Sequence, residues 1–160
     1  MKKAVGLLAL LALAAACRRH DVTVDSNGNT VAVDGKTGQV TVRTNDGTAV
    51  YTGGAGTKLP ADFPSDIPIY PGATVTASVG AAGQAAGKTS HVVTFETSDS
   101  ADSVASFYKA KLAAWQSSAE VGTPEGKMLV LQSPDSRRRV SLLAASKSGK
   151  TSVSLSVEGP

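Results

Sequence analysis

Small apolar residues alternate with polar ones along residues 21–52. The apolar positions are paired and recur every nine residues, as Val22 and Val24, Val31 and Val33, and Val40 and Val42. Asn-Gly and Asp-Gly steps between the pairs supply the positive φ angles of tight hairpins. This pattern predicts a meander of four short strands, each with one apolar face. A small β-solenoid is the alternative that a fixed period leaves open.

Residues 53–73 break this alternation. Residues 53–58 contain three glycines and predict a flexible joint, and residues 59–73 carry four prolines, which exclude a helix. Apolar side chains alternate with the prolines, namely Phe63, Ile67, Ile69 and Tyr70. We therefore expect an extended strap that packs onto the domain that follows. The alternative is a proline-rich ligand for an aromatic groove on another protein.

Residues 74–160 show period-two segments around one stretch of helical period. Strands are expected at residues 74–79, 90–97, 127–132, 138–145 and 151–157. Serines and acids at residues 98–102 mark a helix start. An apolar stripe then follows at Val104, Phe107, Tyr108, Leu112 and Trp115. If Phe107, Leu112 and Trp115 are each buried, each contributes about 2–3 kcal/mol before its entropy cost.

These segments together predict an α+β fold. An N-terminal β meander (residues 21–52) and a linker and strap (residues 53–73) precede an α+β domain (residues 74–160). In that domain an antiparallel sheet of ββαβββ order carries one amphipathic helix on one face. The chain has one cysteine, so no disulfide can form within it and its stability must come from packing.

The first seventeen residues have the features of an export signal. Lys2 and Lys3 give a positive start, residues 4–16 are uncharged and mostly apolar, and Cys17 follows. The apolar run is shorter than the roughly 20 residues that a membrane-spanning helix needs. The arrangement resembles the signal of bacterial lipoproteins, although Ala14 stands where that signal usually carries leucine.

This resemblance implies that residues 1–16 are a signal peptide and that Cys17 becomes the lipidated first residue of a tether (residues 17–20). Several acyl chains, palmitate among them, would hold the protein on a membrane. Arg18 follows the cysteine where aspartate often signals retention in the inner membrane, which favours the outer membrane, facing the periplasm. An ordinary signal peptide cut near Ala16 is the alternative, but it would leave a lone exposed thiol on an exported protein.

The chain from residue 59 onward also resembles a module of uncharacterised bacterial envelope lipoproteins. The marks are the stretch LPADFPSDIPIYPGA at 59–73, the helix segment SVASFYK at 103–109, and Trp115 near the helix end. The resemblance implies an envelope location and a small folded domain. It carries no catalytic residues over to this chain.

Charge and titratable groups argue against several functions. Removal of the signal leaves 14 basic against 13 acidic residues, without the basic stripe of a nucleic-acid binder. The run at residues 137–139 makes Arg137 and Arg139 candidates for partner binding, and a solvated strand entrance is the alternative. His20 and His91 fit no catalytic or metal-ligand pattern, so no metal, cofactor or small-molecule substrate is inferred.

The sequence therefore favours a membrane-anchored, non-catalytic binding or accessory module. Its expected partners are the membrane, through the lipid on Cys17, and another envelope protein. The alternative is a periplasmic hydrolase-like enzyme, which would show a deep pocket with convergent acids or with His91.

Overall fold

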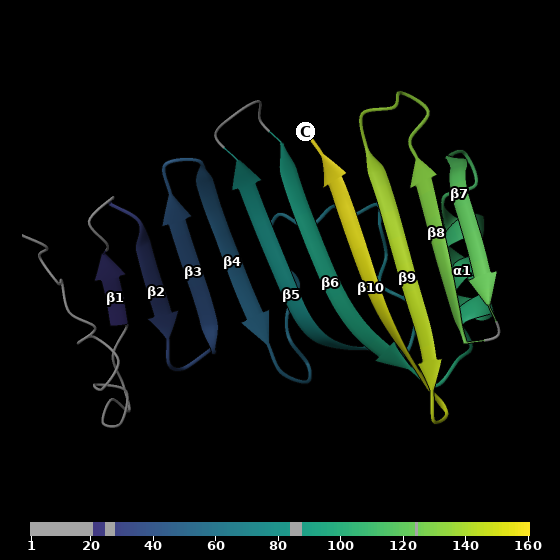
Figure 1. Cartoon of the computed structure of the whole chain (residues 1–160), viewed down its shortest axis with the longest axis horizontal. Coiled ribbons are helices and arrows are strands. Elements are labelled where there is room, and N and C mark those ends of the chain that lie inside the picture. Colours follow the sequence, from purple (N-terminus) through teal and green to yellow (C-terminus); the bar gives the residue numbers. More distant parts are fainter. Residues whose placement is uncertain (1–20, 25–27, 84–87, 124) are drawn as a thin grey trace, which may run out of the picture.

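The computed structural model describes residues 21–24, 28–83, 88–123 and 125–160, and within them the chain forms one antiparallel sheet with a single helix (Figure 1). The strand order is β1-β2-β3-β4-β5-β6-β10-β9-β8-β7. The strands are β1 (Asp21–Val24), β2 (Thr30–Asp34), β3 (Gln39–Thr44), β4 (Gly47–Gly53), β5 (Thr74–Gly83), β6 (Thr89–Thr97), β7 (Gln116–Thr123), β8 (Gly126–Gln132), β9 (Arg139–Lys147) and β10 (Lys150–Gly159). The helix, α1, spans Ala101–Lys111.

The predicted fold class, an α+β fold of ββαβββ order behind a separate meander, is wrong. The described residues form a mainly β structure in which β4 pairs with β5, so the sheet continues without a break from the first strands to the last. The prediction also missed β7, the edge strand next to β8. Nearly every side chain of β7 is exposed, so it has no apolar face that a period-two pattern could reveal.

Helix α1 begins at a serine cap, where the sequence predicts a helix start. Ser100 lies just before the helix, and its hydroxyl accepts a hydrogen bond from the backbone N–H of Ser103 at 3.1 Å. Asp102 lies in the first turn, where the helix dipole favours negative charge, and Lys109 and Lys111 lie in the last turn. The ends of the helix are therefore stabilised locally by the residues that also mark them in the sequence.

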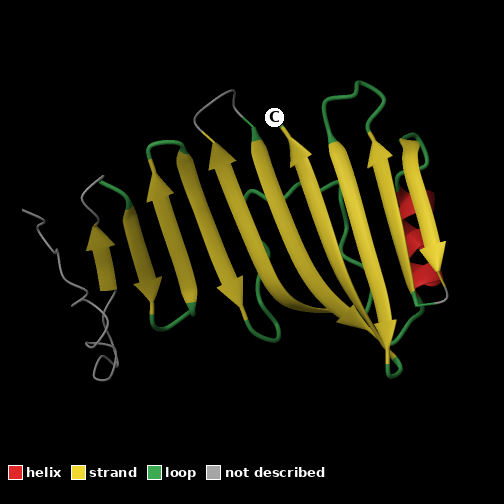
Figure 2. Cartoon of the chain, viewed as in Figure 1, coloured by secondary structure: helices red, strands yellow, loops and turns green. Residues whose placement is uncertain are grey.

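The helix packs on β8 and β9, and Figure 2 shows it behind that end of the sheet. Its buried positions are Ala101, Val104, Ala105 and Tyr108. Leu112, just after the helix, is buried, and Phe107 and Trp115 are partly buried. Both rings pack against the core, with Tyr70 of the strap beside Phe107 and Arg138 beside Trp115.

The core lies between one face of strands β6, β10, β9 and β8 and the layer formed by α1 and the strap. We call this side of the sheet the helix-side face and the other side the open face. Alternate residues of the four strands are buried on the helix-side face, among them Val93, Phe95, Leu129, Leu131, Val140, Leu142, Val153 and Leu155. The same alternation places Ser152, Ser154 and Ser156 of β10 on the open face.

The strap packs onto this core, as the alternation of its apolar residues with prolines predicts. Ile67 is buried in the core, and Phe63, Ile69 and Tyr70 pack against it. The hydroxyl of Tyr108 donates a hydrogen bond to the carbonyl of Pro68 at 3.0 Å. Burial raises the pKa of Tyr108 well above its usual value, so its hydroxyl stays a donor at neutral pH.

In β2 and β3 the apolar side chains lie on the opposite face from those of β6. The pairing register connects Val93 of β6 with Ser78 of β5 and Ser78 with Thr52 of β4, which places all three on the helix-side face. Val40 and Val42 of β3 therefore lie on the open face. The apolar surface of the sheet thus changes sides between its two halves.

Candidate functional site

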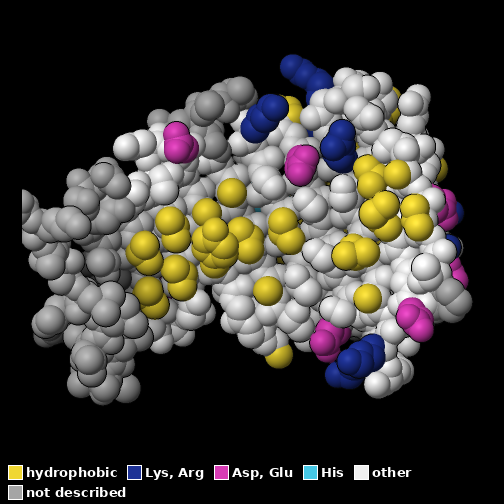
Figure 3. Space-filling view, in the orientation of Figure 1, with side chains coloured by type: hydrophobic (Ala, Val, Ile, Leu, Met, Phe, Trp, Pro, Cys, Tyr) yellow, Lys and Arg dark blue, Asp and Glu magenta, His cyan; other side chains and the backbone are white. Residues whose placement is uncertain are grey.

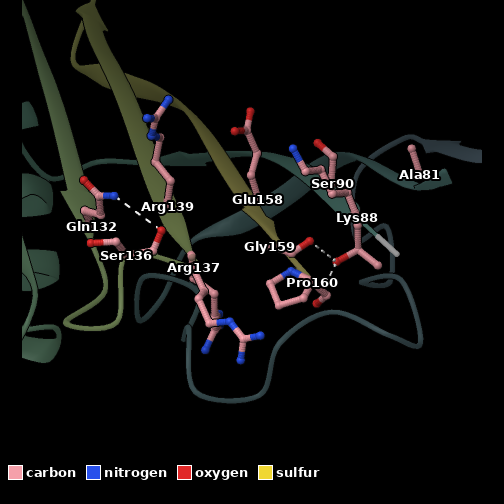
Figure 4. A pocket seen from close by; sticks show the side chains of 12 residues that line it. Ala81, Lys88, Ser90, Gln132, Ser136, Arg137, Arg139, Glu158, Gly159 and Pro160 are labelled. Atoms are coloured by element: carbon pink, nitrogen blue, oxygen red, sulfur yellow. Dashed lines mark hydrogen bonds between the residues drawn. The ribbon is translucent and has the colours of Figure 1, made fainter. Parts of the chain in front are cut away.

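The structure places two of the three predicted site residues and says nothing of the third. Cys17 lies outside the described residues. Arg137 and Arg139 line a cleft of about 630 Å³ at the end of the sheet where β6 begins and β10 ends. Figure 4 shows their side chains extending in opposite directions. They therefore share a cleft but do not converge on one point, and Glu158, the cross-strand neighbour of Arg139, adds a negative charge beside it.

Arg138, between them, fixes the strap to the sheet. Its guanidinium donates two hydrogen bonds to the carboxylate of Asp66, Nη1 to Oδ2 at 2.7 Å and Nη2 to Oδ1 at 3.0 Å. These bonds lower the pKa of Asp66 below its usual value. The guanidinium carbon also lies 5.4 Å from the ring centroid of Trp115, a cation–π distance. Arg138 is thus engaged within the fold.

A larger cavity, of about 780 Å³, lies between the start of the strap and the helix-side face of β4 and β5. One wall is a continuous stretch of chain, residues 53–62. The facing wall consists of Thr48, Val50, Thr52, Ser78, Gly80 and Ala82. Asp34, Thr37 and Gln39 close one side. We call this cavity the strap groove.

Small residues and short hydrogen bonds set the shape of the strap groove. The hydroxyl of Ser78 donates to the carbonyl of Lys58 at 3.1 Å, which holds the strap over β5. Pro60 passes directly over Gly80, where an added Cβ would lie only 3.2 Å from the proline Cβ. A larger residue at position 80 would push the strap away, so the groove depends on this glycine.

His91 is buried beside the groove but does not line it. Its Nε2 lies 3.9 Å from Oδ2 of Asp62, beyond hydrogen-bond distance, and the ring of Phe63 packs edge-on against it. Its Nδ1 is buried and, within the described part of the chain, has no hydrogen-bond partner. The His91–Asp62 pair thus has no nucleophile hydrogen-bonded to the imidazole, which a nucleophile–base pair requires.

Metal ligation finds no support in the described part of the chain. No group of three or more His, Cys, Asp or Glu side chains there could hold a metal ion. Nor does any helix in the described ranges have the length and apolar character needed to cross a membrane.

One comparison with known proteins gives a match. Residues 75–149 are similar to a family described as START domain-like. The matched stretch runs from β5 through α1 to the turn after β9, so it leaves out β1–β4, the strap and β10. No curated protein and no solved structure matches the chain.

Sequence reasoning missed the strap groove because its walls come from segments without a chemical signature. The sequence predicts only a flexible joint at residues 53–58, and Gly80 lies just beyond the strand expected at residues 74–79. The nearest signal is a glycine in a strand, Gly80, because such a glycine often marks a close approach of another segment. Pro60 makes that approach.

Proposed function

We infer that this chain is a lipid-anchored, non-catalytic binding module of the cell envelope, and that the strap groove holds an extended segment of another envelope protein. The observation that carries this proposal is the groove itself. Its volume of about 780 Å³ lies within the roughly 300–1,000 Å³ of typical ligand sites. One wall is ten consecutive residues long (53–62), which suits an extended chain lying along it.

The lining supports binding rather than chemistry. Most of the side chains that line the groove are small or carry hydroxyl or amide groups, such as Thr48, Thr52 and Gln39. These can donate and accept hydrogen bonds with a peptide backbone. The charged lining residues are Asp34, Asp62 and Lys58, so the groove suits a ligand with little net charge or a single positive charge.

The similarity of residues 75–149 to a START domain-like family also favours a ligand-binding domain. Three residues of the groove wall, Ser78, Gly80 and Ala82, lie within that matched stretch. The hydrolase alternative would need a deep pocket with convergent acids or with His91, and His91 does not line the strap groove.

A photo-crosslinker at the groove tests the binding role. We expect p-benzoylphenylalanine at position 52, on the groove wall, to give a discrete protein adduct in intact cells. The same probe in place of Ser152, on the open face of β10, should give none. Val50→Trp should fill the groove and abolish the adduct. Equal labelling from both positions, or an adduct that survives Val50→Trp in a folded protein, would contradict the proposal.

Mass spectrometry of the mature protein tests the anchor. We expect a chain that begins at Cys17 and carries covalent acyl chains, because the signal resembles that of bacterial lipoproteins. The Cys17→Ser variant should lose both the acyl mass and its place in the membrane fraction. An unmodified Cys17 thiol on a protein recovered in the soluble fraction would refute lipid anchoring without affecting the groove.

A further inference from the structure

An apolar surface covers the open face of the N-terminal half of the sheet. Valines of β2 and β3 pair across the strands, Val31 with Val42 and Val33 with Val40. The row continues through Ala49 and Tyr51 of β4 to Ala81 and Val79 of β5. We call these eight residues the open-face patch. Figure 3 shows apolar side chains gathered over these strands, apart from a second group over the far end of the sheet.

The open-face patch is uncharged, and its side chains are exposed or half-buried. Val33 keeps 38% of its surface exposed and Tyr51 keeps 44%. Among the described residues of β2–β5, every charged side chain lies on the other face or in a turn, for example Arg43, which pairs with Thr48. A contiguous apolar patch of this kind on the surface of a protein marks an interaction site.

The composition of the open-face patch suits a lipid surface better than a protein. Protein interfaces are centred on large anchors such as Trp, Tyr, Arg and Met, and valine is under-represented among residues that dominate binding. The patch is mainly Val and Ala, and its one large residue, Tyr51, has the apolar ring and polar tip found at membrane interfaces.

The proposed anchor would bring this face close to a bilayer. Asp21, the first residue of β1, is four positions after Cys17, and four residue steps of extended chain span at most about 14 Å. β1 is the edge strand beside β2. An acylated Cys17 would therefore hold the β1–β4 end of the sheet at the membrane surface, with the other end free to move away.

We propose that the open-face patch rests on the lipid bilayer to which the protein is anchored. This inference rests on the lipid anchor of the proposed function. The patch lacks a basic rim within β2–β5 and would bind a bilayer only weakly alone, so it acts together with the acyl chains. The strap groove lies on the opposite face of β4 and β5. Docking of the patch on lipid therefore turns the groove toward the periplasm, where a partner can reach it.

Fluorescence quenching by brominated lipids tests this orientation. The mature chain from Cys17 is coupled through its single thiol to a maleimide-bearing phospholipid in phosphatidylcholine vesicles. In a Trp115→Phe background, Tyr51→Trp places a probe in the patch. Val121→Trp is the matched control, at an apolar position that is 55% exposed at the far edge of the same open face. Brominated lipids should quench the tryptophan at position 51 and leave that at position 121 unquenched.

Charged substitutions in the patch give a second readout. Val33→Asp with Val42→Asp should abolish quenching at position 51 while the protein stays coupled to the vesicles. Equal quenching at positions 51 and 121, or none at either, overturns the proposal. Shielding at position 51 that grows with protein density and is insensitive to brominated lipid identifies a second copy as the occupant, which also overturns it. Because the maleimide supplies the anchor, a failure of natural acylation at Cys17 is detected separately.

Discussion

Replacing Leu142 with alanine is expected to lower the free energy of unfolding by about 2–5 kcal/mol, whereas Leu143→Ala should change it by no more than about 0.5 kcal/mol. The two leucines are neighbours in β9. Leu142 is 1% exposed and pairs with Leu155 and Leu129 in the core, while Leu143 is 57% exposed on the open face. The alanine at position 142 leaves a cavity, and the alanine at position 143 does not.

Urea denaturation of the two variants, followed by circular dichroism, measures this difference. A loss of 2–5 kcal/mol is a large part of the roughly 5–15 kcal/mol that holds a typical domain folded, so the Leu142→Ala variant should unfold at much lower urea. Similar midpoints for both variants would show that the helix-side face of β9 is not the core. A large effect of Leu143→Ala alone would show that the open face of this strand is covered.

The sequence predicts which residues of a strand share a face, but it does not predict on which side of the sheet that face lies. The valines of β2 and β3 alternate clearly, and this alternation places them together. Their side of the sheet depends on the register through β4 and β5. In β5 a register shift between Val75 and Ala77 moves the alternating apolar residues from the helix-side face, where Val75 packs, to the open face. The change of the apolar surface from one side of the sheet to the other therefore follows from the pairing of the strands and cannot be predicted from alternation within each strand.

The same limit explains the error in fold class. Helix α1 carries its own signals, since Ser100 caps it and Asp102 and Lys109 complement its dipole. Whether the first four strands form a separate meander or join the sheet depends instead on one contact between distant segments, the pairing of β4 with β5. That contact buries no strongly apolar pair, because Val50 lies opposite Gly80 and Thr52 opposite Ser78. The local alternation of apolar and polar residues therefore could not predict the pairing of β4 with β5.

The candidate site was only partly accessible to sequence reasoning for a related reason. A charge run such as residues 137–139 is visible in the sequence, but the direction of each side chain depends on the turn that precedes β9. Arg138 turns to Asp66 of the strap, 72 residues away. Arg137 and Arg139 extend apart in Figure 4. The strap groove, by contrast, is defined by the path of the backbone, and no residue type in the sequence predicts that path.

The second large loss of stability is expected from a substitution in the strap. Ile67→Ala should cost about 2–5 kcal/mol, because Ile67 is the strap residue that is fully part of the core. The other strap contacts are less deeply buried: Phe63, Ile69 and Tyr70 are only partly buried against the core, and Asp66 pairs with Arg138 near the surface. Loss of the isoleucine should therefore free the strap before the sheet unfolds, since elements with few buried contacts open first. Trypsin should then cut more rapidly after the exposed Lys58, at the start of the strap.

Leu59→Ala is the matched control, because Leu59 lies in the same strap and is exposed. It should leave both the urea midpoint and the rate of cleavage after Lys58 close to those of the parent protein. Equal cleavage rates in the two variants would show that Ile67 does not hold the strap down. The Ile67→Ala variant should also lose the adduct from the photo-crosslinker at position 52, since residues 53–62 form one wall of the groove. An adduct of undiminished yield from a released strap would place the binding partner on the sheet rather than between sheet and strap.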